Sequence, residues 1–187
     1  MNYKLSILIC SLPNRLNTLQ NLYLEINRQS MRESVQVLYL GDNKSMTVGE
    51  KRNKLLSIAD GRYITFIDDD DMIKPDYIKR ILDAMNDNPE VITIQVEKFF
   101  NGEKDRPQRF SKSYGRSHRE PDKSFTNMLP NHLCVWRKDV IKESFPPKSL
   151  GEDHIWADLM TKHYNHEINI NEILYTYQFD KSKTETQ

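Results

Sequence analysis

Residues 62–77 read Arg-Tyr-Ile-Thr-Phe-Ile-Asp-Asp-Asp-Asp-Met-Ile-Lys-Pro-Asp-Tyr, and the organisation of the chain follows from this stretch. Its first part, 63–67, is apolar and β-branched or aromatic, which is typical of a buried strand. The strand ends in four consecutive carboxylates, 68–71, which repel one another unless solvent or a cation relieves them. Because ligands bind at the carboxyl ends of strands in α/β sheets, a hard divalent metal held through oxygen would suit this position.

Two strand–helix units precede this stretch. Residues 5–10 form an apolar run typical of a strand covered on both faces, and apolar residues at helical spacing over 14–28 predict a helix. Residues 35–40 predict a second strand, which stops at a Gly-Asp-Asn turn. A second helix begins at the capping-box pattern Thr47-x-x-Glu50 and ends near the Asp-Gly pair before the central strand.

The same alternation continues after the aspartates. Pro75 suits the first turn of a helix with an apolar face over 77–85, and 91–96 predict a fourth strand. This order predicts an α/β, Rossmann-like fold with a mostly parallel central sheet and helices on both faces. With 187 residues, we expect one domain.

After residue 97 the pattern changes. Residues 98–127 are polar and show little periodicity, so we expect a variable loop. It could be a mobile solvated loop, a lid over an acceptor, or a contact for a polyanion such as DNA. Its basic and aromatic residues are Lys98, Phe99, Phe100, Lys104, Arg106, Arg109, Phe110, Lys112, Tyr114, Arg116, Arg119, Lys123 and Phe125.

Order returns in the last third of the chain. A strand is predicted over 133–137, a helix from 151 that carries apolar residues and His163, and a final strand over 173–177. Residues 181–187 form a polar tail that we expect to fray.

Bulk composition excludes several classes of protein. The 27 basic and 27 acidic side chains cancel, so no global field recruits nucleic acid or an anionic membrane. No apolar run approaches the ~18 residues of a spanning helix, and no signal pattern opens the chain. Cys10 and Cys134 are far apart in apolar contexts, which predicts reduced thiols in a cytoplasmic protein.

The four aspartates admit more than one interpretation. Alternate carboxylates could share a metal that also binds a diphosphate, or they could end the strand and cap the next helix. An EF-hand is unsuitable because its sixth and twelfth positions, counted from Asp68, hold Ile73 and Lys79 instead of Gly and Glu. A two-metal nuclease or nucleotidyl transferase is a further alternative.

A second acidic pair, Glu152 and Asp153, follows Gly151 at a predicted helix start. Transfer to a hydroxyl group requires a base that takes the acceptor's proton, and a carboxylate can do this. The helix dipole equally favours acidic residues at this position whether or not they do chemistry.

Three residues earlier in the chain are candidates for nucleotide binding. Asp42 could accept a hydrogen bond from a nucleobase ring N–H, or it could form an Asx turn. Lys51 and Arg52 could neutralise phosphate, or they could be solvated helix cations. The five histidines show no zinc-like spacing, and we expect surface or partly buried positions for most of them. They are His118, His132, His154, His163 and His166.

In order and spacing, these segments resemble the family 2 glycosyltransferases of the GT-A fold over most of the chain outside 98–125. The strongest part of the match is 66–71 followed by 75–77. The other matching segments are 5–11, Asp42-Asn43, Lys51-Arg52-Asn53, 59–64, 131–137 and 151–153.

The resemblance implies transfer of a sugar, with inversion, from a nucleotide-diphosphate donor such as a UDP-sugar. Asp68 and Asp70 look like the family's Asp-x-Asp pair, with Asp70 binding Mn²⁺ or Mg²⁺ and Asp68 closer to the ribose. Asp153 looks like the catalytic base, with Glu152 beside it. Asp71, like its neighbour Asp69, is expected to point away or to cap the next helix, and substitution of either should be milder.

The resemblance also divides the chain into a nucleotide-sugar half, 1–97, and an acceptor half, 128–180. Asp42 matches the base-reading carboxylate, and Ser11 lies on the loop that lines the nucleobase. The donor-binding set is Ser11, Asp42, Lys51, Arg52, Asn53, Asp68 and Asp69. Two places depart from the family's pattern. Leu12 replaces an aromatic residue, and 177–180 replace a histidine that approaches the metal.

The expected acceptor is a hydroxyl group on a glycan, a lipid-linked sugar or a modified DNA base. One competing hypothesis is a nucleotidyl or phosphoryl transferase, although the chain has no Gly-rich P-loop. Another is an inactive sugar-nucleotide-binding domain, against which the intact Asp68, Asp70 and Asp153 argue.

Overall fold

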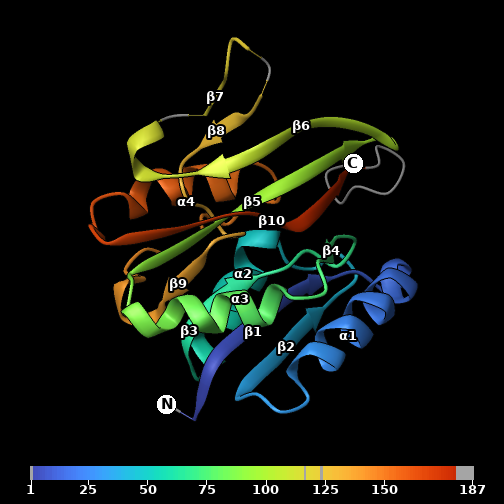
Figure 1. Ribbon diagram of the computed structural model, residues 1–187. Helices are drawn as coiled ribbons and strands as arrows, with labels where there is room; N and C mark the ends of the chain where they lie inside the picture. Colours follow the sequence, from blue (N-terminus) through green and yellow to red (C-terminus); the bar gives the residue numbers. More distant parts are fainter. Residues whose placement is uncertain (1, 116, 123, 180–187) are drawn as a thin grey trace.

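The computed structural model describes residues 2–115, 117–122 and 124–179. Its elements are labelled in Figure 1. In chain order they are β1 (Tyr3–Ser11), α1 (Leu16–Ser30), β2 (Val35–Gly41), α2 (Val48–Ile58), β3 (Gly61–Phe66), β4 (Met72–Ile73), α3 (Tyr77–Ala84), β5 (Val91–Phe100), β6 (Glu103–Phe110), β7 (His118–Arg119), β8 (Thr126–Met128), β9 (Val135–Arg137), α4 (Glu152–Met160) and β10 (Glu167–Phe179).

One twisted sheet runs through the molecule in the order β2-β1-β3-β9-β5-β6-β8-β7. Strand β1 lies parallel to β2 and β3, as the strand–helix alternation predicts. The short strand β9 is antiparallel to both β3 and β5 and thereby joins the two halves of the sheet. Strand β10 pairs in parallel with β5 and antiparallel with β4. The α/β fold is confirmed.

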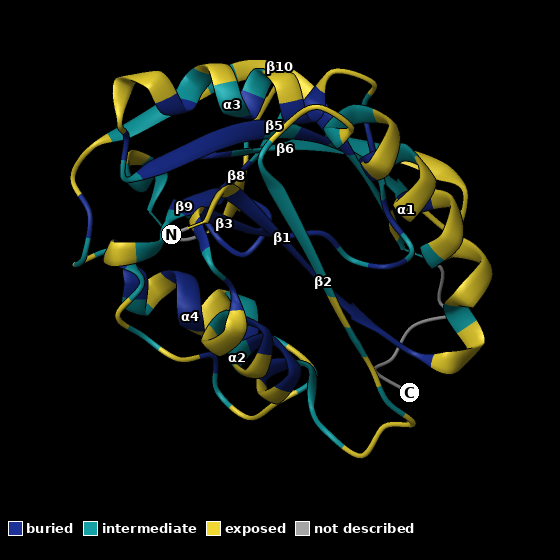
Figure 2. Ribbon diagram, turned by 90° about the horizontal axis from the view of Figure 1, so that it is seen from below, coloured by how far each residue is buried: buried dark blue, intermediate teal, exposed yellow. Residues whose placement is uncertain are grey.

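The helices cover both faces of the sheet. Figure 2 shows α1 and α3 on one side and α2 and α4 on the other, each with its exposed residues turned outward. This arrangement explains why β1 is apolar throughout, since its central residues Leu5, Ile7, Leu8 and Ile9 are all fully buried. Within the described residues, no helix is long and apolar enough to cross a bilayer.

Helix α2 begins where the sequence predicts. The Thr47 side chain accepts a hydrogen bond from Glu50 N, and the Glu50 side chain accepts one from Thr47 N. This reciprocal pairing satisfies two of the free amides at the helix start. The face of α2 that is turned inward carries Lys51 and Arg52.

The prediction of a loop over 98–127 is wrong. Strand β5 continues to Phe100, turns at Asn101 and Gly102, and returns as the antiparallel strand β6, with β8 and β7 beyond it. Both turn residues have positive φ, and Asn-Gly favours a hairpin turn of this kind. The apolar alternation of a strand is missing because several residues of β6 are polar and only partly buried. Arg116 and Lys123 lie outside the described residues.

Two boundaries differ from the prediction. Helix α4 ends at Met160, so His163 lies beyond it. The last strand begins at Glu167, earlier than residue 173, because it pairs along most of β5. The predicted tail, 181–187, lies outside the described residues.

We predict that Gly61→Ala destabilises the protein. A Cβ at this position would lie 2.4 Å from Ser6 N and 2.7 Å from Leu5 C, both in the paired strand β1. Overpacking of this kind typically costs about 1–3 kcal/mol. Urea unfolding measures the loss. Gly41→Ala is the control, because its Cβ would have no neighbour nearer than 3.9 Å. Equal unfolding midpoints for the two variants would contradict the close packing of β1 and β3.

Candidate functional site

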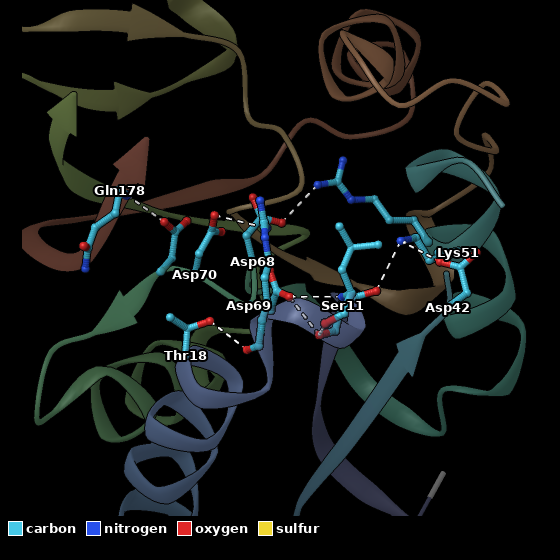
Figure 3. A network of polar contacts seen from close by, with 12 residues as sticks. Ser11, Thr18, Asp42, Lys51, Asp68, Asp69, Asp70 and Gln178 are labelled. Atoms are coloured by element: carbon cyan, nitrogen blue, oxygen red, sulfur yellow. Dashed lines mark hydrogen bonds and ion pairs between the residues drawn. The ribbon is translucent and has the colours of Figure 1, made fainter. Parts of the chain in front are cut away.

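The chain leaves the sheet at the end of β3 and turns through the aspartates of 68–71. Ile67 N donates to Leu8 O of β1 at 3.1 Å, and Asp71 N donates to Asp68 O at 3.1 Å. A turn points consecutive side chains in different directions. The four carboxylates therefore have different surroundings, and three of them are labelled in Figure 3.

Asp69 binds the segment that follows β1. Its buried carboxylate accepts hydrogen bonds from Ser11 Oγ at 2.8 Å, from Leu12 N at 3.4 Å and from Arg15 Nη1 at 2.7 Å. Leu12 is itself buried. These contacts hold the carboxyl ends of β1 and β3 together.

Asp71 binds the last strand. Its buried carboxylate accepts hydrogen bonds from Tyr175 Oη and Gln178 N, both at 2.7 Å. Burial, and then the nearby Asp68 and Asp70 charges, raise the pKa of Asp71. Tyr175 Oη also accepts from Asp68 N at 3.1 Å, so these three hydrogen bonds join β10 to the turn.

The expectation that Asp69 or Asp71 caps the next helix is wrong. The N-cap residue of α3 is Asp76, and its side chain makes no capping bond in the described part of the chain. The two carboxylates are instead used to join β1 and β10 to the end of β3.

A cavity of about 210 Å³ opens beside the aspartates. Asp68, Asp69 and Asp70 line it from the end of β3, and Glu152 and Asp153 line it from the start of α4. Tyr177, Gln178 and Phe179 contribute from β10. The two acidic motifs, about 80 residues apart in the sequence, therefore share one cavity; Asp180 lies outside the described residues.

The two carboxylates predicted to bind metal have opposite pKa shifts. Burial, helped by Asp68 and Asp69 and opposed by Arg15, raises the pKa of Asp70 to about 6. Burial would also raise the pKa of Asp68, but the charges of His132 and Arg52 outweigh it and lower this pKa. Neighbouring acids with divergent pKa values are a common mark of functional sites.

Arg52 connects the aspartates to α4. Its buried guanidinium donates to Asp68 Oδ1 at 3.2 Å and to Glu152 Oε1, and it lies over the rings of Phe66 and Phe145 at 5.6 and 5.4 Å. Burial alone would lower the pKa of Arg52, but the charges of Asp68 and Glu152 outweigh burial and raise this pKa above its usual value. Arg52 is therefore a buried, paired cation, and the interpretation of a solvated cation is wrong.

Asp153 and Glu152 are used differently. Glu152 is buried against Arg52, whereas the Asp153 carboxylate keeps a side-chain exposure of 19% at the cavity. Asn131 Nδ2 donates to Asp153 Oδ2 at 3.5 Å. His132 lies between the motifs, with Nε2 3.4 Å from Asp68 Oδ2 and Nδ1 3.5 Å from Asp153 Oδ2. His132 was not predicted from the sequence as a site residue, although it lies in segment 131–137, which carries part of the resemblance.

The remaining predicted donor-binding residues make hydrogen bonds and ion pairs within the protein. Asp42 accepts hydrogen bonds from Met46 N at 2.7 Å and Ser45 Oγ at 2.9 Å. These are the local contacts of a turn, one of the two alternatives considered for Asp42. Lys51 is fully buried, with Nζ 3.1 Å from Asp42 Oδ1 and 3.4 Å from Ser11 O (Figure 3). It is therefore neither solvated nor among the described residues that line the cavity.

Asn53 bridges α2 to the segment before α4. Its Nδ2 donates to Phe145 O at 2.8 Å, and its Oδ1 accepts from Phe145 N at 2.9 Å. Both ends of the amide are thus used by backbone groups. Of the donor-binding set, Arg52, Asp68 and Asp69 line the cavity, whereas Ser11, Asp42, Lys51 and Asn53 are not among its described lining residues.

The residues present suit a divalent cation. Among the described residues, no three or more His, Cys, Asp or Glu side chains are arranged to hold a metal by themselves. Mg²⁺ usually binds through one or two carboxylates together with substrate phosphates, and Asp68 and Asp70 supply such a pair. The raised pKa of Asp70 indicates negative charge that a cation would stabilise.

Comparison with known proteins identifies the family of this chain. The model of glycosyl transferase family 2 matches residues 21–145. A relative, the uncharacterized glycosyltransferase MJ1057 of Methanocaldococcus jannaschii, is 22% identical over 162 residues, which cover 82% of this chain and 54% of that protein. The chain thus spans about half the length of this curated relative.

Solved structures of S. aureus TarS 1-349 share the fold. The form in complex with UDP-GlcNAc gives a TM-score of 0.70 at 15% identity and covers 97% of this chain and 60% of TarS 1-349. The form in complex with UDP gives 0.68 at 15% identity, covering 95% and 61%.

We predict that Arg52→Met is strongly destabilising while Lys54→Met, on the exposed side of the same helix, is not. Removing Arg52 leaves Asp68 and Glu152 without their shared partner, and breaking a buried ion pair costs about 3–5 kcal/mol. Chemical denaturation measures both variants. The additional change Glu152→Gln should recover part of the loss, and a fully additive double variant would contradict the pairing.

Proposed function

The chain belongs to glycosyl transferase family 2, and we propose that it transfers a sugar from a UDP-sugar to a hydroxyl acceptor with inversion at the anomeric carbon. The observation that carries this proposal is the shared cavity, which is lined both by Asp153 of α4 and by Asp68 and Asp70 of the turn after β3. The TarS complexes with UDP-GlcNAc and UDP support a UDP donor by their similar fold.

The two acidic motifs suit the two ends of such a reaction. Asp153 takes the proton from the acceptor hydroxyl as the new bond to the anomeric carbon forms. The bond from that carbon to the diphosphate breaks at the same time. A single displacement of this kind inverts the anomeric centre because the nucleophile enters opposite the leaving group.

Asp70 and Asp68 would hold Mn²⁺ or Mg²⁺, which when bound neutralises the negative charge of the departing diphosphate. Arg15 lies at the same cavity, with Nη1 3.1 Å from Asp70 Oδ2. Arg15 is therefore placed to bind a phosphate oxygen as well. Sequence reasoning did not single it out because a lone arginine after a turn has no distinctive pattern.

We assign His132 a positioning role. Its two ring nitrogens approach the carboxylates of Asp68 and Asp153, so it sets the spacing between the donor-side acid and the base. Ser11, Asp42, Lys51 and Asn53 position the ends of β1, β2 and α2 that would surround the nucleotide. The inverting mechanism, the metal and the acceptor all belong to this proposal.

Asp153→Asn tests the base. Turnover should fall by about 10²–10⁴-fold, because the amide cannot take the acceptor proton, while UDP affinity stays unchanged. The assay is UDP release from a panel of sugar nucleotides with Mn²⁺ and candidate acceptors, scored by mass spectrometry. Asp83→Asn is the control, because the Asp83 side chain is an exposed partner of Lys79 on α3. Undiminished turnover in Asp153→Asn would refute the base assignment, and release of pyrophosphate would favour nucleotidyl transfer.

Asp70→Asn tests the metal. Calorimetric titration with UDP should give at least about tenfold tighter binding with Mn²⁺ than without it, and Asp70→Asn should remove this difference. Asp76→Asn, an exposed change a few residues along, serves as the control. Equal UDP affinity with and without Mn²⁺ in the unaltered protein would contradict metal-assisted donor binding.

A further inference from the structure

A second cavity of about 440 Å³ is lined by Asn131, the residue that contacts Asp153. Asn131 lines this second cavity, while its Nδ2 donates to Asp153, which lines the first. Asn131 therefore lies between the second cavity and the carboxylate assigned as the base. A molecule in the second cavity would contact the residue that is hydrogen-bonded to this carboxylate.

Helix α4 presents different faces to the two cavities. Glu152 and Asp153 line the first, whereas His154, Ala157 and Asp158 line the second. Residues spaced by three and four share one face of a helix. Helix α4 thus connects the base rigidly to the wall of the second cavity.

The wall has the composition of a small-molecule site. Asn131, His154 and Asp158 supply hydrogen-bond donors and acceptors, and Met128, Leu129 and Ala157 supply apolar surface. A sugar ring presents the matching features, since hydroxyl groups line its edge and C–H bonds form its faces. The volume also falls within the range of about 300–1,000 Å³ typical of ligand pockets.

The carboxylates at the second cavity disfavour anionic ligands. Asp158 lies on this wall and Asp153 lies just beyond Asn131, so a phosphate group would approach two carboxylates. Like charges at short range are unfavourable, especially in a partly enclosed site. Neutral hydroxyl-bearing ligands avoid this repulsion, whereas nucleic acid and sugar phosphates do not.

We propose that the second cavity is the acceptor subsite and that it takes a neutral sugar, whose hydroxyl is directed past Asn131 to Asp153. This inference rests on the proposed function and names the substrate class of the same site. His154 and Asp158 bind the acceptor, and Asn131 orients the base beside it.

Binding can be measured without turnover. The unaltered protein is titrated, with and without UDP, with three kinds of probe: neutral mono- and disaccharides, glucose 6-phosphate, and an oligonucleotide bearing a 5-hydroxymethyl base. Binding is detected by saturation-transfer NMR and by shifts of the His154 ring resonances. A neutral saccharide should bind and shift those resonances. His154→Ala and Asp158→Ala should each weaken it about tenfold, as expected for a lost hydrogen bond to the ligand.

Ile155→Ala is the matched control, because Ile155 is 39% exposed and lies on α4 next to His154 but is not among the described lining residues. It should keep saccharide affinity, and all three variants should keep UDP affinity. The inference is overturned if no neutral saccharide binds, if the anionic probes bind better, or if the variants bind as well as the unaltered protein. Failure of UDP to bind would instead contradict the proposed function. The inference about the second cavity would still be tested in that case, because saccharide binding is also measured without UDP.

Discussion

The buried ion pairs of Arg52 are the constraint on which the rest of the site depends. A guanidinium removed from water is very unfavourable unless carboxylates and hydrogen bonds surround it. Arg52 finds them only if α2, the end of β3 and the start of α4 come together, since Asp68 and Glu152 lie on different elements. The capping box at Thr47 and the contact of Gly49 N with Lys148 O at 3.0 Å place α2 for this purpose. The geometry of the cavity follows from meeting these requirements together.

Four identical residues in succession have separate roles because the backbone turns beneath them. Asp69 and Asp71 stabilise the fold: Asp69 binds the segment after β1, and Asp71 binds β10. Asp68 and Asp70 keep access to the cavity, and their pKa values are shifted in opposite directions by different neighbours. Local environment, and not residue type, therefore decides which carboxylates can bind a ligand.

The antiparallel strand β9 brings the two acidic motifs of this chain to one cavity. It lies between β3 and β5, and the segment just before it carries Asn131 and His132 to the cavity. The segments that carry the two acidic motifs are thus joined through one sheet. The hairpin of β5 and β6 continues that sheet outward and leaves its polar face partly exposed.

The alternating strands and helices, the capping box and the acidic motifs could be predicted from the sequence, because burial pattern and helix-start chemistry are local properties. The hairpin over 98–110 was missed since its strands lack apolar alternation, although Asn101-Gly102 carried a turn signal. Partners distant in the chain could not be predicted at all. That Lys51 is buried against Asp42, that Asn53 bridges to Phe145, and that His132 lies between Asp68 and Asp153 are decided by tertiary packing, which alone determines which polar groups lose water and must find one another.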